Sequence, residues 1–342
     1  MAQTSSLDFM LLKRLTQTFG PSGSEDTIRS VIIQEIQSYC DEISTDVMGN
    51  LIARRQGKGK NIMIAAHMDE IGIMVTHIDE KGFLRFTPIG GVRVNELPHR
   101  KVQFKNATIG VIGMEKLDKL ADLKLERLFI DIAANSKEDA ESRIRVGDTA
   151  VFVGEFHDQG DKIISKALDD RIGCFIAIEA LKRVKSTFPL SFVFTVQEEV
   201  GLRGAQTSAY ALEPDLAIAV DVTLTGDTPK AHRMDVKLGS GAAIKVLDRS
   251  IITPPQIKRW MIKTAEEKEI KYQLEVLESG GTDSGAIHLT KSGVPAGVIS
   301  IPTRYVHSTA EMADKHDIEA AVNLLVALLE SYELPSRVEE NN

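Results

Sequence analysis

Imidazole and carboxylate side chains occur after short apolar runs, or just before a predicted helix, in this sequence of 342 residues. The residues concerned are His67, Asp69, Asp169, Asp170, Glu198, Glu199, Asp221 and His307. Histidine combined with carboxylates suits Zn²⁺, Co²⁺ or Mn²⁺, whereas oxygen ligands alone would suit Mg²⁺ or Ca²⁺. A hydrolytic centre with two metals needs a bridging carboxylate, further ligands on each metal and a separate carboxylate as base. These residue types are sufficient for such a centre.

Each of these motifs also has an ordinary structural explanation. The pair Asp169–Asp170 could cap a helix and oppose its dipole, Asp221 could begin a turn, and His307 could be a surface histidine. A functional site is favoured because these residues occur together, most of them at the ends of predicted strands, with few other polar residues there.

The adjacent carboxylates of Glu198 and Glu199 raise the alternative of a glycosidase, because two-carboxylate hydrolysis of sugars is common. Neighbouring residues of an extended segment point to opposite sides, which disfavours a position of these two groups around one glycosidic bond. They are better suited to different partners, one to a metal and the other to the attacking water.

The polar residues follow apolar runs that alternate with predicted helices. The runs cover residues 62–66, 192–196, 216–220 and 296–301, and the main predicted helices cover residues 171–185, 255–269 and 317–332. Continuous apolar runs predict strands that are buried on both faces, as in a mostly parallel sheet flanked by helices. Ligands of such sheets bind beyond the carboxyl ends of the strands, which is where the polar residues lie.

Two shorter helices are predicted before residue 40, separated by the segment GPSG at residues 20–23. Ser22 with Glu25 resembles a capping box at the start of the second helix. Residues 71–160 differ from the rest, with short β-rich pieces and one short helix near residues 136–143. The predicted fold is therefore α/β, a mixed and mostly parallel sheet flanked by helices, with an inserted small β-barrel. The α/β domain would comprise residues 1–70 and 163–342, around an inserted domain of residues 71–162.

Composition disfavours several classes of partner. The 41 basic and 49 acidic residues give a net charge of −8, so the basic surface that nucleic acids or anionic membranes require is not expected. The uncharged stretch of the last predicted helix, residues 320–329, has about half the length of a membrane span. Cys40 and Cys174 lie far apart without a CxxC spacing, and no apolar signal-peptide block precedes Asp8. We therefore expect a cytoplasmic protein that binds neither nucleic acid nor membrane.

Six segments together resemble the signature blocks of a known family. They are HMDEIG (67–72), KALDDR (166–171), QEEVG (197–201), DVT (221–223), GGTD (280–283) and IPTRYVHS (301–308). In content and order they resemble the tetrahedral (TET) aminopeptidases, the glutamyl aminopeptidase-like family of dinuclear metallopeptidases. The first helix and residues 20–23 match as well, so the resemblance covers nearly the whole chain.

The resemblance implies a metal site with two divalent cations per subunit, Zn²⁺ or Co²⁺, with Mn²⁺ as an alternative. Asp169 would bridge the two cations. His67 and Asp221 would complete one metal site. Glu199 and His307 would complete the other.

The resemblance also implies roles for the residues around the metals. Glu198 would be the general base, and Asp69 would orient the imidazole of His67. A cis peptide would join Asp169 to Asp170. The inserted β-barrel would be the dimerisation domain, and dimers would assemble into a tetrahedral homododecamer.

The expected activity is the hydrolysis of N-terminal residues from short peptides by a metal-activated water. Three alternatives stay open: a metal-dependent deacylase of N-acyl amino acids or peptides, an endoglucanase-like glycosidase, and a non-catalytic assembly protein. Residues 280–283 are either a loop of the substrate cleft, since paired glycines permit close backbone approach, or a tight turn.

Overall fold

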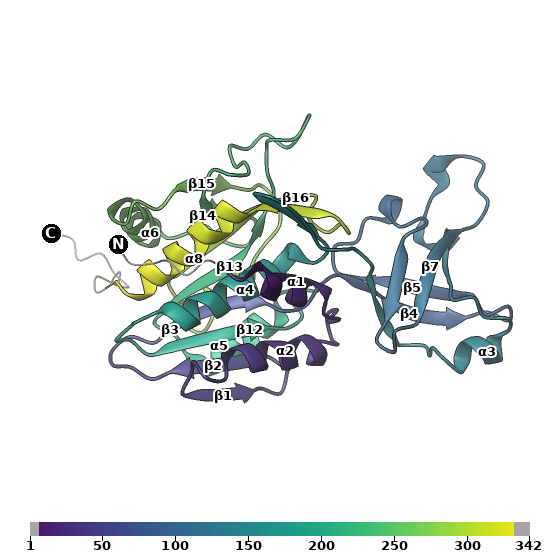
Figure 1. Ribbon diagram of the computed structural model, residues 1–342, viewed down its shortest axis with the longest axis horizontal. Helices are drawn as coiled ribbons and strands as arrows, with labels where there is room; N and C mark the ends of the chain where they lie inside the picture. Colours follow the sequence, from purple (N-terminus) through teal and green to yellow (C-terminus); the bar gives the residue numbers. More distant parts are fainter. Residues whose placement is uncertain (1–6, 332–342) are drawn as a thin grey trace.

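The computed structural model describes residues 7–331, which form an α/β domain with a small β-barrel at one end (Figure 1). The α/β domain is built on an 11-stranded sheet. Its main path runs through β1 (Glu42–Thr45), β2 (Leu51–Arg55), β12 (Leu190–Thr195), β3 (Ile62–His67), β13 (Leu216–Thr223), β16 (Ala296–Arg304), β17 (Glu311–Asp314), β11 (Lys162–Ser165) and β10 (His157–Gln159). The branch from β16 contains β14 (Ala242–Leu247) and β15 (Tyr272–Val276).

The centre of the sheet is parallel, as the continuous apolar runs predicted. Strand β3 pairs in parallel with β12 and β13, and β13 pairs in parallel with β16. Every residue of β3, β12 and β13 is buried, because helices cover both faces of the sheet. Outer pairs such as β1 with β2 are antiparallel, so the sheet is mixed and the predicted fold class is confirmed.

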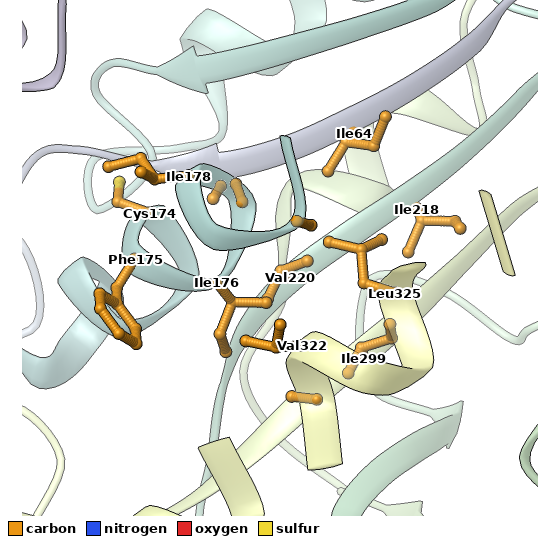
Figure 2. Close-up of a cluster of buried hydrophobic side chains, with 14 of the residues drawn as sticks. Ile64, Cys174, Phe175, Ile176, Ile178, Ile218, Val220, Ile299, Val322 and Leu325 are labelled. Atoms are coloured by element: carbon orange, nitrogen blue, oxygen red, sulfur yellow. The ribbon is translucent and has the colours of Figure 1, made fainter. Parts of the chain in front are cut away.

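Helices form an apolar layer on each face of the sheet. One layer contains α1 (Phe9–Gln17), α2 (Asp26–Ile36), α4 (Leu168–Arg183), α6 (Pro255–Glu267) and α8 (Lys315–Leu329), and the other contains α5 (Arg203–Leu212) and α7 (Asp283–Ile287). Alternate residues of β3 face the two helix layers. Ile62 and Ile64 pack in the first layer, and Met63 and Ala65 pack in the second. Figure 2 shows the first layer, where Ile176 of α4 lies near Val220 of β13.

Two of these helices, α5 and α7, were not predicted from the sequence. Helix α5 turns only small residues inward, and α7 has five residues, so neither presents the apolar stripe that marks a longer helix. Helix α8 ends at Leu329, whereas its predicted end, residue 332, lies outside the described residues. Within residues 7–331, no helix combines the length and the apolar character needed to span a membrane.

The barrel is a closed set of six strands with an apolar core of its own. In order around the barrel they are β4 (Gly72–Ile78), β5 (Leu84–Ile89), β8 (Leu128–Asp131), β7 (Ile109–Met114), β6 (Lys101–Phe104) and β9 (Thr149–Phe152). Its helical segments are η1 (Val94–Glu96), η2 (Leu120–Asp122), η3 (Leu125–Arg127) and α3 (Lys137–Glu141). The next strands along the chain, β10 and β11, already belong to the large sheet.

A buried arginine joins the N-terminal segment to the middle of the α/β domain. The guanidinium of Arg171, near the start of α4, donates to the backbone carbonyls of Leu15, Thr18 and Gly20. It also forms an ion pair with Glu70, in which Nη2 and Oε1 lie 3.3 Å apart. These contacts hold the turn after α1 beside the end of β3.

Candidate metal centre

The parallel strands and α4 direct their polar residues into one cavity of about 440 Å³. Strand β3 ends in a histidine, β13 carries an aspartate, two glutamates follow β12, and a second histidine follows β16. The predicted residues that line the cavity are His67, Asp169, Glu198, Glu199, Asp221 and His307. Segments that are far apart in the sequence therefore meet at the carboxyl ends of the strands, as such sheets require.

The carboxylate of Asp169 lies between the two histidines. Its Oδ1 is 3.0 Å from Nε2 of His67, and its Oδ2 is 3.2 Å from Nε2 of His307. Nε2 of His307 is also 3.2 Å from Oε2 of Glu199, and Nε2 of His67 is 3.9 Å from Oδ1 of Asp221. Ligand atoms of one tetrahedral zinc ion lie about 3.3 Å from each other. The donor atoms around Asp169 therefore lie at the spacing of metal ligands, and those of His67, Asp169 and Glu199 all lie within 4.8 Å of one another.

The site holds more negative charge than its imidazoles balance. Burial alone would lower the pKa of His307, but the carboxylates of Glu199 and Asp169 raise it to about 12. The pKa of His67 is likewise raised well above its usual value, against the effect of burial. Divalent cations would supply the positive charge that these carboxylates favour, in place of protons on the imidazoles. The residues present therefore fit two divalent cations.

Glu198 lies beside the donor atoms rather than among the closest pairs. Its Oε2 is 3.9 Å from Nε2 of His67, and its side chain lines the cavity. Burial raises the pKa of the Glu198 carboxyl well above its usual value, with the charge of Asp221 adding to the rise and that of His67 opposing it. A carboxyl group beside the donor atoms is placed to exchange a proton with a water molecule there, as a general base and acid must.

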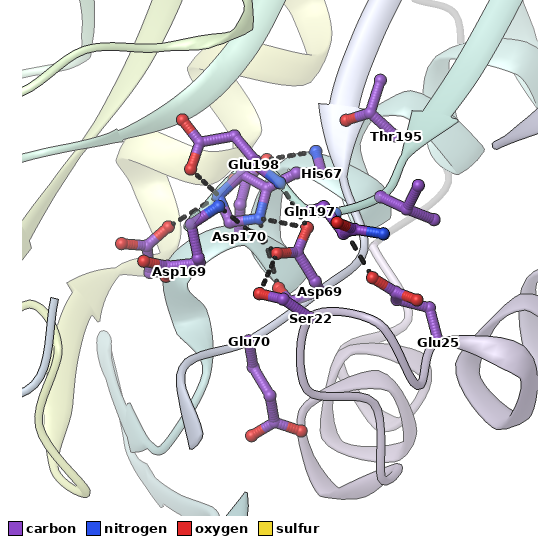
Figure 3. A network of polar contacts seen from close by, with 12 residues as sticks. Ser22, Glu25, His67, Asp69, Glu70, Asp169, Asp170, Thr195, Gln197 and Glu198 are labelled. Carbon is purple, nitrogen blue, oxygen red and sulfur yellow. Dashed lines mark hydrogen bonds and ion pairs between the residues drawn. The ribbon is translucent and has the colours of Figure 1, made fainter. Parts of the chain in front are cut away.

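Asp69 connects the histidine of β3 to the glutamates after β12 (Figure 3). Its backbone carbonyl lies 3.2 Å from Nδ1 of His67 and can accept a hydrogen bond from that nitrogen, while Nε2 faces Asp169. Its carboxylate oxygens accept hydrogen bonds from the backbone N–H groups of Glu198 (3.1 Å) and Glu199 (3.3 Å). The Asp69 carboxylate is 3.6 Å from Nδ1 of His67. The Asp69 carboxylate therefore accepts from the glutamate segment and from the hydroxyl of Ser22, while the backbone carbonyl of Asp69 meets the imidazole.

Comparison with known proteins agrees with this geometry. A family profile of M42 glutamyl aminopeptidases matches residues 49–324. The chain belongs to the M42 family. It is similar to a putative aminopeptidase of Acetivibrio thermocellus, with 54% identity over 93% of this chain and 97% of the relative. It is also similar to the lysyl aminopeptidase of Pyrococcus furiosus, with 34% identity over 95% and 97% of the two chains.

A solved peptidase structure has a similar fold. The TET1 peptidase of Pyrococcus horikoshii, which can assemble into a tetrahedron or a large octahedral shell, is 36% identical, with a TM-score of 0.86 over 94% of this chain and 98% of that one. This M42 protein is therefore an aminopeptidase, an exopeptidase of the hydrolase class, and a dinuclear centre is a general property of its family.

In this M42 protein, the carboxylate of Asp170 has different partners from that of its neighbour Asp169. The peptide bond between Asp169 and Asp170 is cis. The Asp170 carboxylate accepts hydrogen bonds from the backbone N–H groups of His67 (3.2 Å) and Gly173 (3.0 Å). His67, Asp170 and Asp221 also place donor atoms near one another. Because the Asp170 oxygens already accept from the backbone, this residue is better described as supporting His67.

Glu311 was missed in the sequence, although it touches the backbone of two donor residues. Its Oε2 accepts from the N–H of Asp169 (3.0 Å), and its Oε1 accepts from the N–H of His307 (2.8 Å). Glu311 is buried on β17, four residues after His307. The only sign of Glu311 in the sequence is its position four residues after His307. This spacing does not by itself distinguish Glu311 from other acidic residues.

The capping box predicted at the second helix is wrong. The hydroxyl of Ser22 donates to the Asp69 carboxylate at 2.6 Å, and Glu25 accepts from the N–H groups of Gly23 and Gln197. Helix α2 begins at Asp26 and has no side-chain cap at Glu25. Both polar side chains support the site, because the buried Asp69 carboxylate and the segment before Glu198 need hydrogen-bond partners.

The barrel also contributes to the centre, through the turn that follows β5. The carbonyl of Gly91 lies 3.1 Å from Nδ1 of His307 and can accept a hydrogen bond from it. A Cβ atom added at Gly91 would lie 2.5 Å from that same nitrogen, and one added at Gly90 would lie 3.1 Å from Cβ of Glu199. One half of the centre, His307 with Glu199, is therefore packed directly against the inserted barrel.

Residues 280–283 also lie at the cavity. Gly280, Gly281 and Thr282 line it, while Asp283 is buried and accepts a hydrogen bond from the hydroxyl of Thr195. Of the two readings of this motif, the structure supports the loop of the cleft.

Proposed function

We propose that this M42 protein is a metal-dependent aminopeptidase that removes N-terminal residues from short peptides with two divalent cations per subunit. The observation that carries the proposal is the position of Asp169, whose two oxygens face two different histidines at 3.0 and 3.2 Å. His67 and Asp221 would hold one cation with Asp169. Glu199 and His307 would hold the other. Zn²⁺ or Co²⁺ suits this donor set, and Mn²⁺ is the alternative.

The mechanism assigns a separate task to each residue beside the donors. Bound cations would acidify a water molecule and polarise the scissile carbonyl. Glu198 takes the proton of the attacking water, whose oxygen bonds to the carbonyl carbon, and later delivers that proton to the amine as the C–N bond breaks. Asp69 holds the backbone of Glu198 and Glu199, so that one carboxylate faces the water and the next faces a metal. His67 keeps its proton on Nδ1, which leaves Nε2 free to bind.

The decisive experiment separates the base from the bridging ligand. Glu198→Gln is expected to keep two metals per subunit while turnover of leucyl-p-nitroanilide falls by about 10²- to 10⁴-fold. Asp169→Asn is expected to lose metal as well as activity. Metal content is measured by elemental analysis, and rates are measured after chelation and after adding back Zn²⁺, Co²⁺ or Mn²⁺. Glu155→Gln, at a glutamate whose side chain is 82% exposed, is the matched control and should keep both.

Three outcomes would contradict parts of this proposal. A fully active Glu198→Gln enzyme would remove Glu198 from the role of base. Hydrolysis of N-acetylated peptides in preference to free N-termini would instead indicate a deacylase. Chelator-resistant release of sugar from β-glucans would indicate a glycosidase, which needs no metal.

We further propose that the inserted barrel, whose strands lie between Gly72 and Phe152, pairs subunits and that dimers build a homododecamer. The assembly of the similar TET1 peptidase supports this proposal. So do Ile109 and Val111 of β7, which expose apolar side chains on the barrel. Cys40 and Cys174 are both free thiols, which suits the reducing cytoplasm, and we propose that location.

A further inference from the structure

The cavity continues beyond the donor residues along an apolar wall. The aliphatic residues that line it are Leu202, Val222, Leu224, Leu277 and Val306. The glycine-rich loop at Gly280 and Gly281 lines it as well, leaving room beside this wall. Because the scissile carbonyl must lie at the donor atoms, the side chain of the N-terminal residue is the part of a peptide that can occupy this space.

The two charged side chains that line the cavity besides the proposed metal and base residues are each paired with carboxylates of the protein itself. Outside the proposed metal and base residues, the charged residues that line the described cavity are Arg93 and Lys245. Arg93 forms an ion pair with Glu96, with Nη1 and Oε1 3.1 Å apart, and its side chain is half exposed. No further carboxylate lines the described cavity, so the side-chain ammonium group of a substrate lysine would also lack a partner away from the proposed metal and base residues.

Lys245 is already neutralised inside the protein. Its side chain is 1% exposed, and its ammonium forms ion pairs with the carboxylates of Glu275 and Asp248, which are completely buried. Glu275 also accepts a hydrogen bond of 2.7 Å from the hydroxyl of Thr223. Two carboxylates therefore surround one ammonium group, and this buried cluster has no positive charge to offer an acidic side chain.

We propose that this wall is the binding site for the substrate's N-terminal side chain and that it selects uncharged aliphatic residues such as leucine and methionine. The proposal rests on the proposed aminopeptidase function. An aliphatic side chain gains free energy by leaving water against the five aliphatic residues. A glutamate or lysine side chain would lose its hydration without gaining a charged partner. The Lys245–Glu275–Asp248 cluster therefore contributes to the specificity for uncharged side chains, because the ammonium group of Lys245 is already paired and is not available to a substrate carboxylate.

The first test compares substrates on the metal-loaded wild-type protein. We expect kcat/KM for leucyl-p-nitroanilide to exceed that for the glutamyl and lysyl substrates by about tenfold or more. A glutamyl or lysyl value equal to the leucyl value would overturn the inference and leave the aminopeptidase function intact. If no aminoacyl substrate is turned over, the proposed function itself fails.

The second test introduces an unpaired positive charge into the wall. Leu277→Arg should raise the ratio of glutamyl to leucyl kcat/KM by about tenfold, the effect of one charge-assisted contact. Leu274→Arg is the matched control, because Leu274 is 46% exposed on β15 and does not line the cavity, and the ratio should not change. Ratios are independent of the fraction of folded enzyme, so partial misfolding does not affect the comparison.

A third variant acts on the cluster itself. Glu275→Gln removes one of the two negative charges around Lys245 and should also raise the glutamyl-to-leucyl ratio. If neither Leu277→Arg nor Glu275→Gln changes the ratio, the wall does not contact the substrate side chain and the inference is overturned.

Discussion

Glu311 shows how one carboxylate outside the donor set can hold two donor residues in place. It accepts the backbone N–H groups of Asp169 and His307, which lie on separate segments. Asp169 would bridge both metals, whereas His307 would bind only one. The geometry of the His307 half of the site therefore depends on a residue that would bind no metal itself.

Replacing Glu311 should weaken metal binding before it affects the fold. Glu311→Ala leaves two buried N–H groups without their acceptor, so the affinity for the second metal should fall by about 10- to 100-fold. Glu311→Gln keeps one carbonyl acceptor and should give an intermediate loss. Metal content per subunit after dialysis measures the effect, with exposed Glu319→Ala as the control. Two tightly held cations in Glu311→Ala would contradict this role.

Sequence reasoning could find the residues of the site that have metal-binding chemistry, but not those that support them. His67 and Asp221 were identifiable because strands of this kind end in few polar residues. Glu311 and Ser22 were not, since each acts on a partner that only the fold brings near. The hydrogen bond between Ser22 and Asp69 spans 47 residues, and that between Glu311 and Asp169 spans 142.

At the scale of elements, strand ends determine one half of the centre and the inserted barrel contacts the other. His67 and Asp221 lie on adjacent parallel strands and are buried between neighbours. His307 lies on the chain after β16, with a positive φ of 64°, and its imidazole meets the carbonyl of Gly91. The apolar runs predicted the first half well. The contact with Gly91 could not be predicted, because it joins residues 216 positions apart.

Adding one methyl group at Gly91 should test this contact. Gly91→Ala places a Cβ atom 2.5 Å from Nδ1 of His307, so the imidazole must move. We expect one metal per subunit to be lost or bound about 10- to 100-fold more weakly, while the metal at His67 stays. Val146→Ala is the control on the barrel, because the Val146 side chain is 61% exposed and lies away from the centre. Calorimetric titration with Zn²⁺ distinguishes loss of one site from loss of both.

At the scale of the molecule, the barrel presents apolar surface away from its own core. Ile109 and Val111 of β7 are 49% and 41% exposed, while their neighbours Gly110 and Ile112 point inward. Short β-rich pieces predicted that a barrel would be present. They did not predict its exposed face, because the alternation of β7 alone does not show which side is covered.

A charge on this face should disrupt assembly if the barrel pairs subunits. Val111→Glu is expected to shift the protein toward smaller particles, because a carboxylate would have to be buried without a partner. Light scattering coupled to gel filtration measures the mass. Val47→Glu, at a fully exposed valine of the α/β domain, should leave the mass unchanged. An unchanged mass for Val111→Glu would argue that another surface forms the contact.

The contacts of Arg171 affect the order in which parts of the chain can fold during synthesis. Its hydrogen bonds to the carbonyls of Leu15, Thr18 and Gly20 close loops of 156, 153 and 151 residues. The first helix therefore cannot gain these bonds until residue 171 has left the ribosome, by which time the entire barrel has been made. The turn after α1 therefore gains these contacts only when a segment 151 to 156 residues further along the chain has been synthesised.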